Sequence, residues 1–219
     1  MIKLPDFDKS FEYENNFYLT SDLSRINKIV IQYQLYKKIQ SISGSIVECG
    51  VFKGVSSIRF AAFRKFFKDS SKKIILFDIF GKFPDAVDPK DVKQREKFIK
   101  DAGINSIYKM QLNKVFRKKK IKNYELIKGD ITKTVRDYKE KHPRLKISLL
   151  HIDVDLYEPT KIILDNFYSM ISKGGIIILD DYKVFSGETR AVDEFFKDKK
   201  IKIQKFKNTK TPYYIIKKE

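Results

Sequence analysis

The chain has 219 residues, a length that fits one domain. A hydrophobic share of 42% and an aromatic share of 14% are enough for a folded core and exclude wholesale disorder. The single cysteine, Cys49, excludes an intrachain disulfide, and no run of about 18 apolar residues is present for a membrane span. Because the first residues also lack a signal-peptide pattern, we expect a cytoplasmic protein.

The formal net charge of +18 would suit nucleic acid or an anionic membrane surface as a partner. However, the lysines are spread along the chain, and residues 117–122 form its dense basic run. The sequence has no RNA-binding module signature and no zinc-ligand spacing, so nucleic acid is not the favoured partner. A solvated lysine-rich surface and the recognition of an acidic substrate both stay open.

Short apolar runs alternate with amphipathic stretches, which is typical of a parallel sheet covered by helices. The predicted strands are 46–49, 74–78, 124–127, 147–154 and 176–179. The predicted helices are 22–40, 55–68, 90–102, 107–117, 132–140 and 160–172. Residues 201–206 and 213–217 predict a C-terminal hairpin. We therefore expect a Rossmann-like α/β fold, with a mostly parallel seven-stranded sheet, helices on both faces and an antiparallel C-terminal strand.

No internal repeat or linker divides the sequence, so residues 1–219 are expected to form a single domain. Residues 1–43 are interpreted as an N-terminal helical extension. Its apolar face is expected to contain Leu23, Ile26, Ile29, Val30, Tyr33 and Leu35. The segment 81–103 is long for a strand-to-helix connection, and we expect part of it to form a mobile lid over the substrate.

Almost every predicted strand ends in an acid, and ligands of such sheets bind at the carboxyl ends of the strands. These end residues are Glu48 with Gly50, Asp78, Asp130, Asp153 with Asp155, and Asp180 with Asp181. We therefore expect one site to gather these side chains.

The loop after the first strand contains Gly50 and Gly54, which allow a ligand to approach the backbone closely. It lacks the dinucleotide-binding and phosphate-loop patterns. Glu48 before the glycines favours a ligand with an amino group. Ser56 and Ser57 follow in the same loop, where Ser56 and backbone N–H groups can bind a carboxylate. A plain tight turn is the alternative interpretation.

Asp78 at the end of the second strand suits a bidentate contact with ribose hydroxyls. After the third strand, Asp130 can accept from an adenine amino group while Ile131 packs on the ring. Asp130 is alternatively the N-cap of the helix that follows, and the two roles can coexist through different oxygens.

The pair Asp153 and Asp155 and the pair Asp180 and Asp181 follow neighbouring strands. Burying carboxylates close together is costly without a cation. Oxygen ligands of this kind suit magnesium or another hard divalent ion. Acids that merely cap loops are the alternative.

Six segments resemble the macrocin O-methyltransferase family, which methylates sugar hydroxyls in antibiotic biosynthesis. They are VECGVFKG, FDIFGKFP, KGDITKT, HIDVDLYEPT, GGIIILDDY and AVDEFF, which lie in this order within residues 44–196. The resemblance implies a class I methyltransferase fold that uses S-adenosylmethionine and magnesium. It implies that the metal ligands are Asp153, Asp180 and Asp181. It implies cofactor contacts at Glu48, Ser56, Asp78 and Asp130.

Related catechol-type enzymes have a lysine three residues after the first metal aspartate, where this chain has Leu156. A catechol acceptor is therefore disfavoured. Asp153 is our candidate for the residue that takes the proton, with His151 or Asp155 as helpers. His151 as a packed strand residue is the alternative.

The sequence therefore predicts an S-adenosylmethionine- and magnesium-dependent O-methyltransferase of a sugar or glycosylated small molecule. We expect Tyr157, Tyr182 and Phe185 to line the acceptor pocket. An anionic acceptor steered by Lys82, Lys90 and Lys93, and a homo-oligomer, both stay open. The alternatives are a phenolic or other small hydroxyl acceptor, or a basic nucleic-acid-binding protein that retains the fold.

Overall fold

The computed structural model describes residues 1–85 and 89–218, and within them the strands form a seven-stranded sheet. The strands are β1 (Ser45–Cys49), β2 (Ile74–Asp78), β3 (Tyr124–Lys128), β4 (Ile147–Ile152), β5 (Ile171–Leu179), β6 (Gln204–Lys205) and β7 (Tyr213–Ile216). Their order is β3-β2-β1-β4-β5-β7-β6, with β1 to β5 parallel and β7 antiparallel to β5 and β6. The predicted sheet is confirmed, and its switch point lies between β1 and β4.

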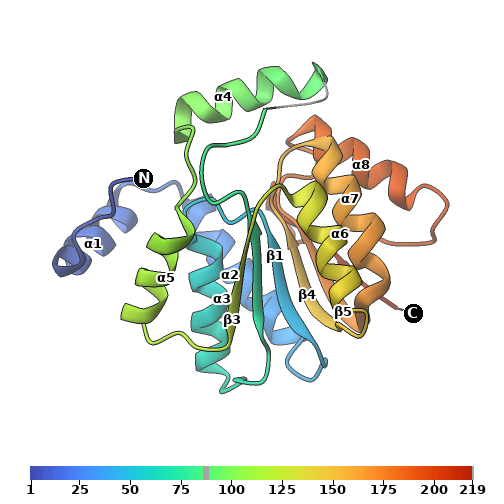
Figure 1. Cartoon of the computed structure of the whole chain (residues 1–219), viewed down its shortest axis with the longest axis horizontal. Helices are drawn as coiled ribbons and strands as arrows, with labels where there is room; N and C mark the ends of the chain where they lie inside the picture. Colours follow the sequence, from blue (N-terminus) through green and yellow to red (C-terminus); the bar gives the residue numbers. More distant parts are fainter. Residues whose placement is uncertain (86–88, 219) are drawn as a thin grey trace.

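Helices cover both faces of the sheet (Figure 1). They are α1 (Ser10–Thr20), α2 (Leu23–Lys38), α3 (Val55–Phe66), α4 (Val92–Ala102), α5 (Lys109–Lys118), α6 (Ile131–Lys141), α7 (Tyr157–Phe167) and α8 (Ser186–Phe196). Short 3-10 turns are η1 (Phe7–Lys9), η2 (Pro89–Asp91) and η3 (Tyr168–Met170). Buried side chains of α6, α7 and α8 form one core with the sheet, and those of α2, α3 and α5 form the other. Strands buried on both faces explain the continuous apolar runs in the sequence.

Several elements differ from the predictions. The helix predicted at 160–172 is α7, which begins at Tyr157 because Pro159 fits a first helical turn, where no backbone donor is needed. It ends at Phe167, because β5 already begins at Ile171. The strand predicted to reach residue 154 ends at Ile152, and the one predicted at 201–206 is only Gln204–Lys205. Helix α1 lies within the predicted N-terminal helical extension, whereas α8 was not predicted.

The N-terminal segment contributes to the core through a face of α2 that overlaps the predicted one only in part. Leu35 is buried as predicted, but Leu23 is 73% exposed and Val30 is 53% exposed, while Ile31 and Tyr36 are buried without having been predicted. Apolar residues lie on both sides of this helix, so periodicity alone identified the packed face only in part. As a result α2 lies in the same layer as α3 and α5.

The predicted lid segment lies across the edge where the parallel strands end (Figure 1). It contains η2 and α4, while residues 86–88 lie outside the described part of the chain. Its mobility stays a prediction. No helix in the described residues is both long and apolar enough to cross a membrane.

Part of the positive charge lies at helix ends. The last turns of α2, α3, α5 and α6 contain Lys37, Lys38, Arg64, Lys65, Arg117, Lys118, Lys139 and Lys141. Basic side chains there stabilise the negative end of the helix dipole. These four helices lead into β1, β2, β3 and β4, so their ends lie at the amino ends of the strands, opposite the predicted site.

Candidate active site

The carboxyl ends of the parallel strands surround a cleft of about 560 Å³. It spans the switch point between β1 and β4, where ligands bind in sheets of this kind. The predicted site residues that line it are Gly50, Asp78, Asp130, Ile131, Asp153, Asp155, Asp180 and Asp181. Those that do not line it are Glu48, Gly54, Ser56, Ser57 and His151.

Gly50 lies where the ends of β1 and β4 approach each other closely. Its φ is 88°, and a Cβ atom there would lie 1.7 Å from the carbonyl oxygen of Asp153. Only glycine fits this position without a shift of the backbone. The close approach therefore depends on Gly50.

Asp78 is buried at the end of β2, and its two oxygens accept from four protein donors. Oδ2 accepts from the backbone N–H groups of Val51 (2.8 Å) and Phe52 (3.0 Å). Oδ1 accepts from the N–H of Phe80 (2.6 Å) and the hydroxyl of Ser106 (2.8 Å). Phe52 and Phe80 have φ values of 49° and 47°, which bulky residues rarely adopt. Asp78 thus stabilises two strained turns at the cleft, and no sequence pattern pointed to Ser106.

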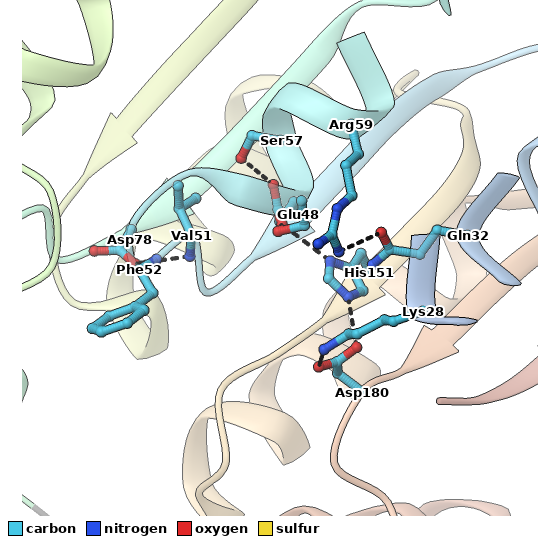
Figure 2. Close-up of polar contacts among 11 residues, drawn as sticks. Lys28, Gln32, Glu48, Val51, Phe52, Ser57, Arg59, Asp78, His151 and Asp180 are labelled. Atoms are coloured by element: carbon cyan, nitrogen blue, oxygen red, sulfur yellow. Dashed lines mark hydrogen bonds and ion pairs between the residues drawn. The ribbon is translucent and has the colours of Figure 1, made fainter. Parts of the chain in front are cut away.

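Glu48 lies in the core beneath the cleft, with protein partners on both oxygens. Ser56 donates to Oε1 and Ser57 donates to Oε2. The ring of His151 places Nδ1 3.1 Å from Oε1 of Glu48 and Nε2 3.3 Å from Oδ1 of Asp180 (Figure 2). Burial alone would lower the pKa of His151, but Asp180 and Glu48 raise it to about 10. The two carboxylates therefore favour the protonated, cationic form of the His151 ring that joins them.

Asp130 is the residue before α6 and lies at the cleft. Its Oδ1 accepts from the backbone N–H (2.9 Å) and the hydroxyl (2.7 Å) of Thr132, so the N-cap interpretation is confirmed. Asp130 and Ile131 both line the cleft, and the predicted adenine contact stays a prediction.

The four clustered aspartates form two overlapping groups. Ligand atoms of Asp153, Asp155 and Asp181 lie within 4.8 Å of one another, and so do those of His151, Asp153 and Asp180. Burial, followed by neighbouring carboxylates, raises the pKa of Asp153 and Asp181. Burial also raises the pKa of Asp155 to about 7. A hard divalent cation would relieve this repulsion, so the donor set fits the predicted metal.

Asp180 differs from its neighbours because two cations contact it. Lys28, on α2, donates to Oδ2, while His151 faces Oδ1 (Figure 2). Burial alone would raise the pKa of Asp180, but Lys28 and His151 hold it well below its usual range. Lys28 and Arg25 both line the cleft. Sequence reasoning missed both, because the pattern of α2 does not distinguish them from surface residues.

The segment around α4 is docked on the first turns of α7 and α8. Oδ2 of Asp91 accepts from the N–H of Tyr157 (2.8 Å). Oε1 of Gln94 accepts from the N–H (3.0 Å) and the hydroxyl (2.9 Å) of Ser186. These contacts satisfy donors that a helix leaves free at its start. Asp91, which the sequence did not single out, also lines the cleft.

The aromatic wall of the cleft differs from the prediction. Phe185 lines the cleft as expected, whereas Tyr157 and Tyr182 do not. The ring of Phe98, on α4, packs 5.2 Å from that of Phe52 and 5.3 Å from that of Phe83, and all three line the cleft. The lid segment therefore supplies an apolar wall that was not predicted.

A mostly parallel seven-stranded sheet with antiparallel C-terminal strands and a cleft at the switch point defines the class I methyltransferase fold. The crystal structure of CalS11, a calicheamicin methyltransferase, is similar, with a TM-score of 0.79 and 25% identity. This similarity covers 94% of the present chain and 85% of CalS11.

The family described as Macrocin-O-methyltransferase (TylF) matches residues 24–213, and the chain belongs to this family. One relative is the 8-demethyl-8-(2,3-dimethoxy-alpha-L-rhamnosyl)-tetracenomycin-C 4'-O-methyltransferase of Streptomyces olivaceus, 26% identical over 65% of this chain and 54% of that protein. Another is the demethyldecarbamoylnovobiocin O-methyltransferase of Streptomyces niveus, 27% identical over 71% of this chain and 59% of that protein. The chain thus spans little more than half the length of these relatives.

Proposed function

We propose that this protein is an S-adenosylmethionine- and magnesium-dependent O-methyltransferase that acts on a sugar or a glycosylated small molecule. The observation that carries the proposal is the group of Asp153, Asp155 and Asp181 at a cleft that Asp78 and Asp130 also line. Family membership supports it, and one relative is named for the 4′-O-methylation of a rhamnosyl-bearing tetracenomycin.

Gly50, Asp78, Asp130 and Ile131 are the residues proposed to hold the cofactor, because they line the cleft on the β1, β2 and β3 side. S-adenosylmethionine would supply an electrophilic methyl group there. Asp78 fixes the turn at Val51 and Phe52 as well as offering acceptors to a ribose.

Glu48, Ser56 and Ser57 lie outside the cleft lining, so we propose that they position the loop that contains Gly50 and Gly54. A direct contact of Glu48 with the cofactor ammonium group stays a prediction.

Asp153, Asp180 and Asp181 are the proposed metal ligands. They are divided between the two groups, since Asp181 lies with Asp153 and Asp155, and Asp180 lies with Asp153 and His151. A magnesium ion would supply Lewis acidity that makes the acceptor hydroxyl more acidic. Asp153 is proposed to take the hydroxyl proton, because it lines the cleft and is not fully buried. Asp155 is the second candidate. His151 has a carboxylate at each ring nitrogen, so we propose that it positions Asp180 rather than accepts a proton.

The charged residues that line the cleft affect which acceptor can bind there. Nine acidic residues and three basic residues, Arg25, Lys28 and Lys133, belong to its lining. Lys82, Lys90 and Lys93, which we expected to steer an anion, are exposed and do not line it. A single divalent ion would offset only part of this negative charge, so the lining supports a neutral sugar more than an anionic one.

Release of S-adenosylhomocysteine from S-adenosylmethionine and a panel of glycosides tests the proposal. We expect turnover that EDTA abolishes and magnesium restores. Asp180→Asn should slow transfer while leaving S-adenosylhomocysteine affinity within a few-fold, and Asp165→Asn, on the exposed face of α7, is the matched control. Full turnover in EDTA would remove the metal from the proposal. A protein that binds nucleic acid but ignores S-adenosylhomocysteine in calorimetry would support the alternative class.

A further inference from the structure

Helix α2 brings a lysine into the carboxylate cluster from a distant part of the chain. Lys28 precedes Asp180 by 152 residues, and its Nζ donates to Oδ2 of Asp180 (Figure 2). The Lys28 side chain is 21% exposed and that of Asp180 is 4% exposed. Ion pairs on a solvated surface contribute little, but this one is shielded from water, so its charges interact more strongly.

The described cations of this region contact only one of the four clustered aspartates. Asp180 has Lys28 on one oxygen and His151 on the other. Asp153, Asp155 and Asp181 form no ion pair with any described residue, although the first and third also lie within the field of Lys28. Asp180, which two cations contact, therefore lies beside three aspartates that no described cation contacts.

A divalent ion held by Asp153, Asp180 and Asp181 would need an oxygen of Asp180. Oδ1 faces His151 and Oδ2 binds Lys28, so neither oxygen is without a cation at present. His151 is fully buried and fixed between two carboxylates, whereas Lys28 has a long, partly exposed side chain at the cleft. Of the two cations, Lys28 is therefore the one that can withdraw.

We propose that Lys28 is a tethered counter-ion of the metal site, which neutralises Asp180 in the metal-free protein and competes with an entering divalent cation. The inference rests on the proposed function for the identity of the ion. Its consequence is that α2, which lies outside the strand-end loops, tunes metal affinity. An ion pair with only a structural role would instead stabilise the fold equally with and without metal.

Calorimetric titration of the substrate-free protein with manganese or magnesium tests the proposal. Removing a unit charge next to the ion should tighten binding about tenfold or more in Lys28→Met. The same variant should melt at a lower temperature than wild type in EDTA, because Asp180 loses a partner. Saturating metal should reduce this difference in melting temperature between the variant and wild type. Lys28→Arg, which keeps the charge, should bind metal within a few-fold of wild type.

Lys161→Met is the matched control, since it removes an exposed lysine that pairs with Asp165 at 2.8 Å on α7. It should change neither metal affinity nor the difference in melting temperature between EDTA and metal. If Lys28→Met does not fold, Lys28→Gln serves in its place.

Unchanged or weaker metal binding by the Lys28 variant, with wild type binding normally, would overturn the Lys28 proposal and leave the proposed function intact. An equal decrease in the melting temperature of the variant in EDTA and in saturating metal would also overturn the Lys28 proposal. If wild type binds no divalent ion and transfer proceeds in EDTA, the metal role in the proposed function fails and the Lys28 proposal fails with it.

Discussion

Nδ1 of His151 lies 3.1 Å from Oε1 of Glu48, and neither side chain is exposed to solvent. Nε2 of the same ring faces Asp180, so one imidazole joins the end of β1 to the end of β5. The loop that borders the proposed cofactor site and the loop that borders the metal ligands therefore share a buried charged residue.

Replacing His151 should be costly for the fold. His151→Asn would leave Glu48 and Asp180 without the cation between them, and loss of one partner from a buried ion pair costs about 3–5 kcal/mol. Urea unfolding measures this loss. His142→Asn, at an exposed position after α6, loses only a ring contact with Tyr138 at 4.1 Å and should cost at most about 1.5 kcal/mol. A loss below about 1 kcal/mol in His151→Asn would mean that the ring does not compensate the two acids.

Asp78→Asn should weaken S-adenosylhomocysteine binding. The amide nitrogen cannot accept a hydrogen bond, so the N–H groups at Val51 and Phe52 or the donors at Phe80 and Ser106 lose their partner. We expect a loss of about 1.5–3 kcal/mol, the range for hydrogen bonds to a charged group. Calorimetry checks it, with Asp137→Asn on the exposed face of α6 as control. An unchanged dissociation constant would place the nucleoside elsewhere.

The acids at strand ends could be predicted from the sequence because short apolar runs fix where each parallel strand stops. Asp78, Asp153 and Asp180 could be assigned to one site in this way, because the carboxyl ends of neighbouring parallel strands meet at one edge of the sheet. Which acids face the cleft could not be predicted in this way. Glu48 ends β1 as expected, yet it points into the core, toward His151.

Residues that reach the cleft from other elements had no signal in the sequence. Lys28 resembles any lysine of an amphipathic helix, and its partner is 152 residues away. Asp91 lies in a charged segment, and its role depends on the first turn of α7. Tertiary packing alone brings these side chains to the site.

Metal binding should release protons. Burial and neighbouring carboxylates raise the pKa of Asp153 and Asp181, and that of Asp155 to about 7, so metal must displace protons near neutral pH. Apparent magnesium affinity should therefore rise as pH increases through neutrality. Calorimetry in buffers of different ionisation enthalpy counts the protons. An affinity that does not change between about pH 6 and 8 would contradict this prediction.

The stability of the metal-free protein should fall as pH rises, whereas its affinity for magnesium should increase. The pKa of Asp155 in the fold, about 7, lies above its unfolded value of about 3.9, so the folded state holds the proton more tightly. Stability is then lost as pH rises from about 4 to about 7. Magnesium should restore it at the upper end of this range, which thermal unfolding with and without EDTA can measure.

The contact between the lid segment and α7 should control access to the cleft. Asp91→Ala removes the acceptor of the Tyr157 N–H, so amides of α4 should exchange faster with deuterium and S-adenosylhomocysteine should bind more weakly. Gly187→Ala tests the same contact by crowding, because a Cβ there would lie 2.5 Å from Oδ1 of Asp91. Asp101→Ala, exposed on α4, is the control. Exchange unchanged in both variants would show that the segment is held by other contacts.

The acceptor should be a neutral sugar rather than an anion. The cleft lining contains nine acidic and three basic residues, so an anionic acceptor meets repulsion that a neutral glycoside does not. The test compares neutral glycosides, nucleotide-linked sugars and catechols by release of S-adenosylhomocysteine. For the best neutral acceptor, kcat/KM should change less than about twofold as salt rises from about 0.05 to 0.3 M, because screening acts only between charges. Nucleotide sugars that react faster than every neutral glycoside, with a rate that falls steeply with salt, would restore the anionic interpretation. Catechol turnover above that of every sugar would contradict the sugar assignment and leave the methyltransferase proposal in place.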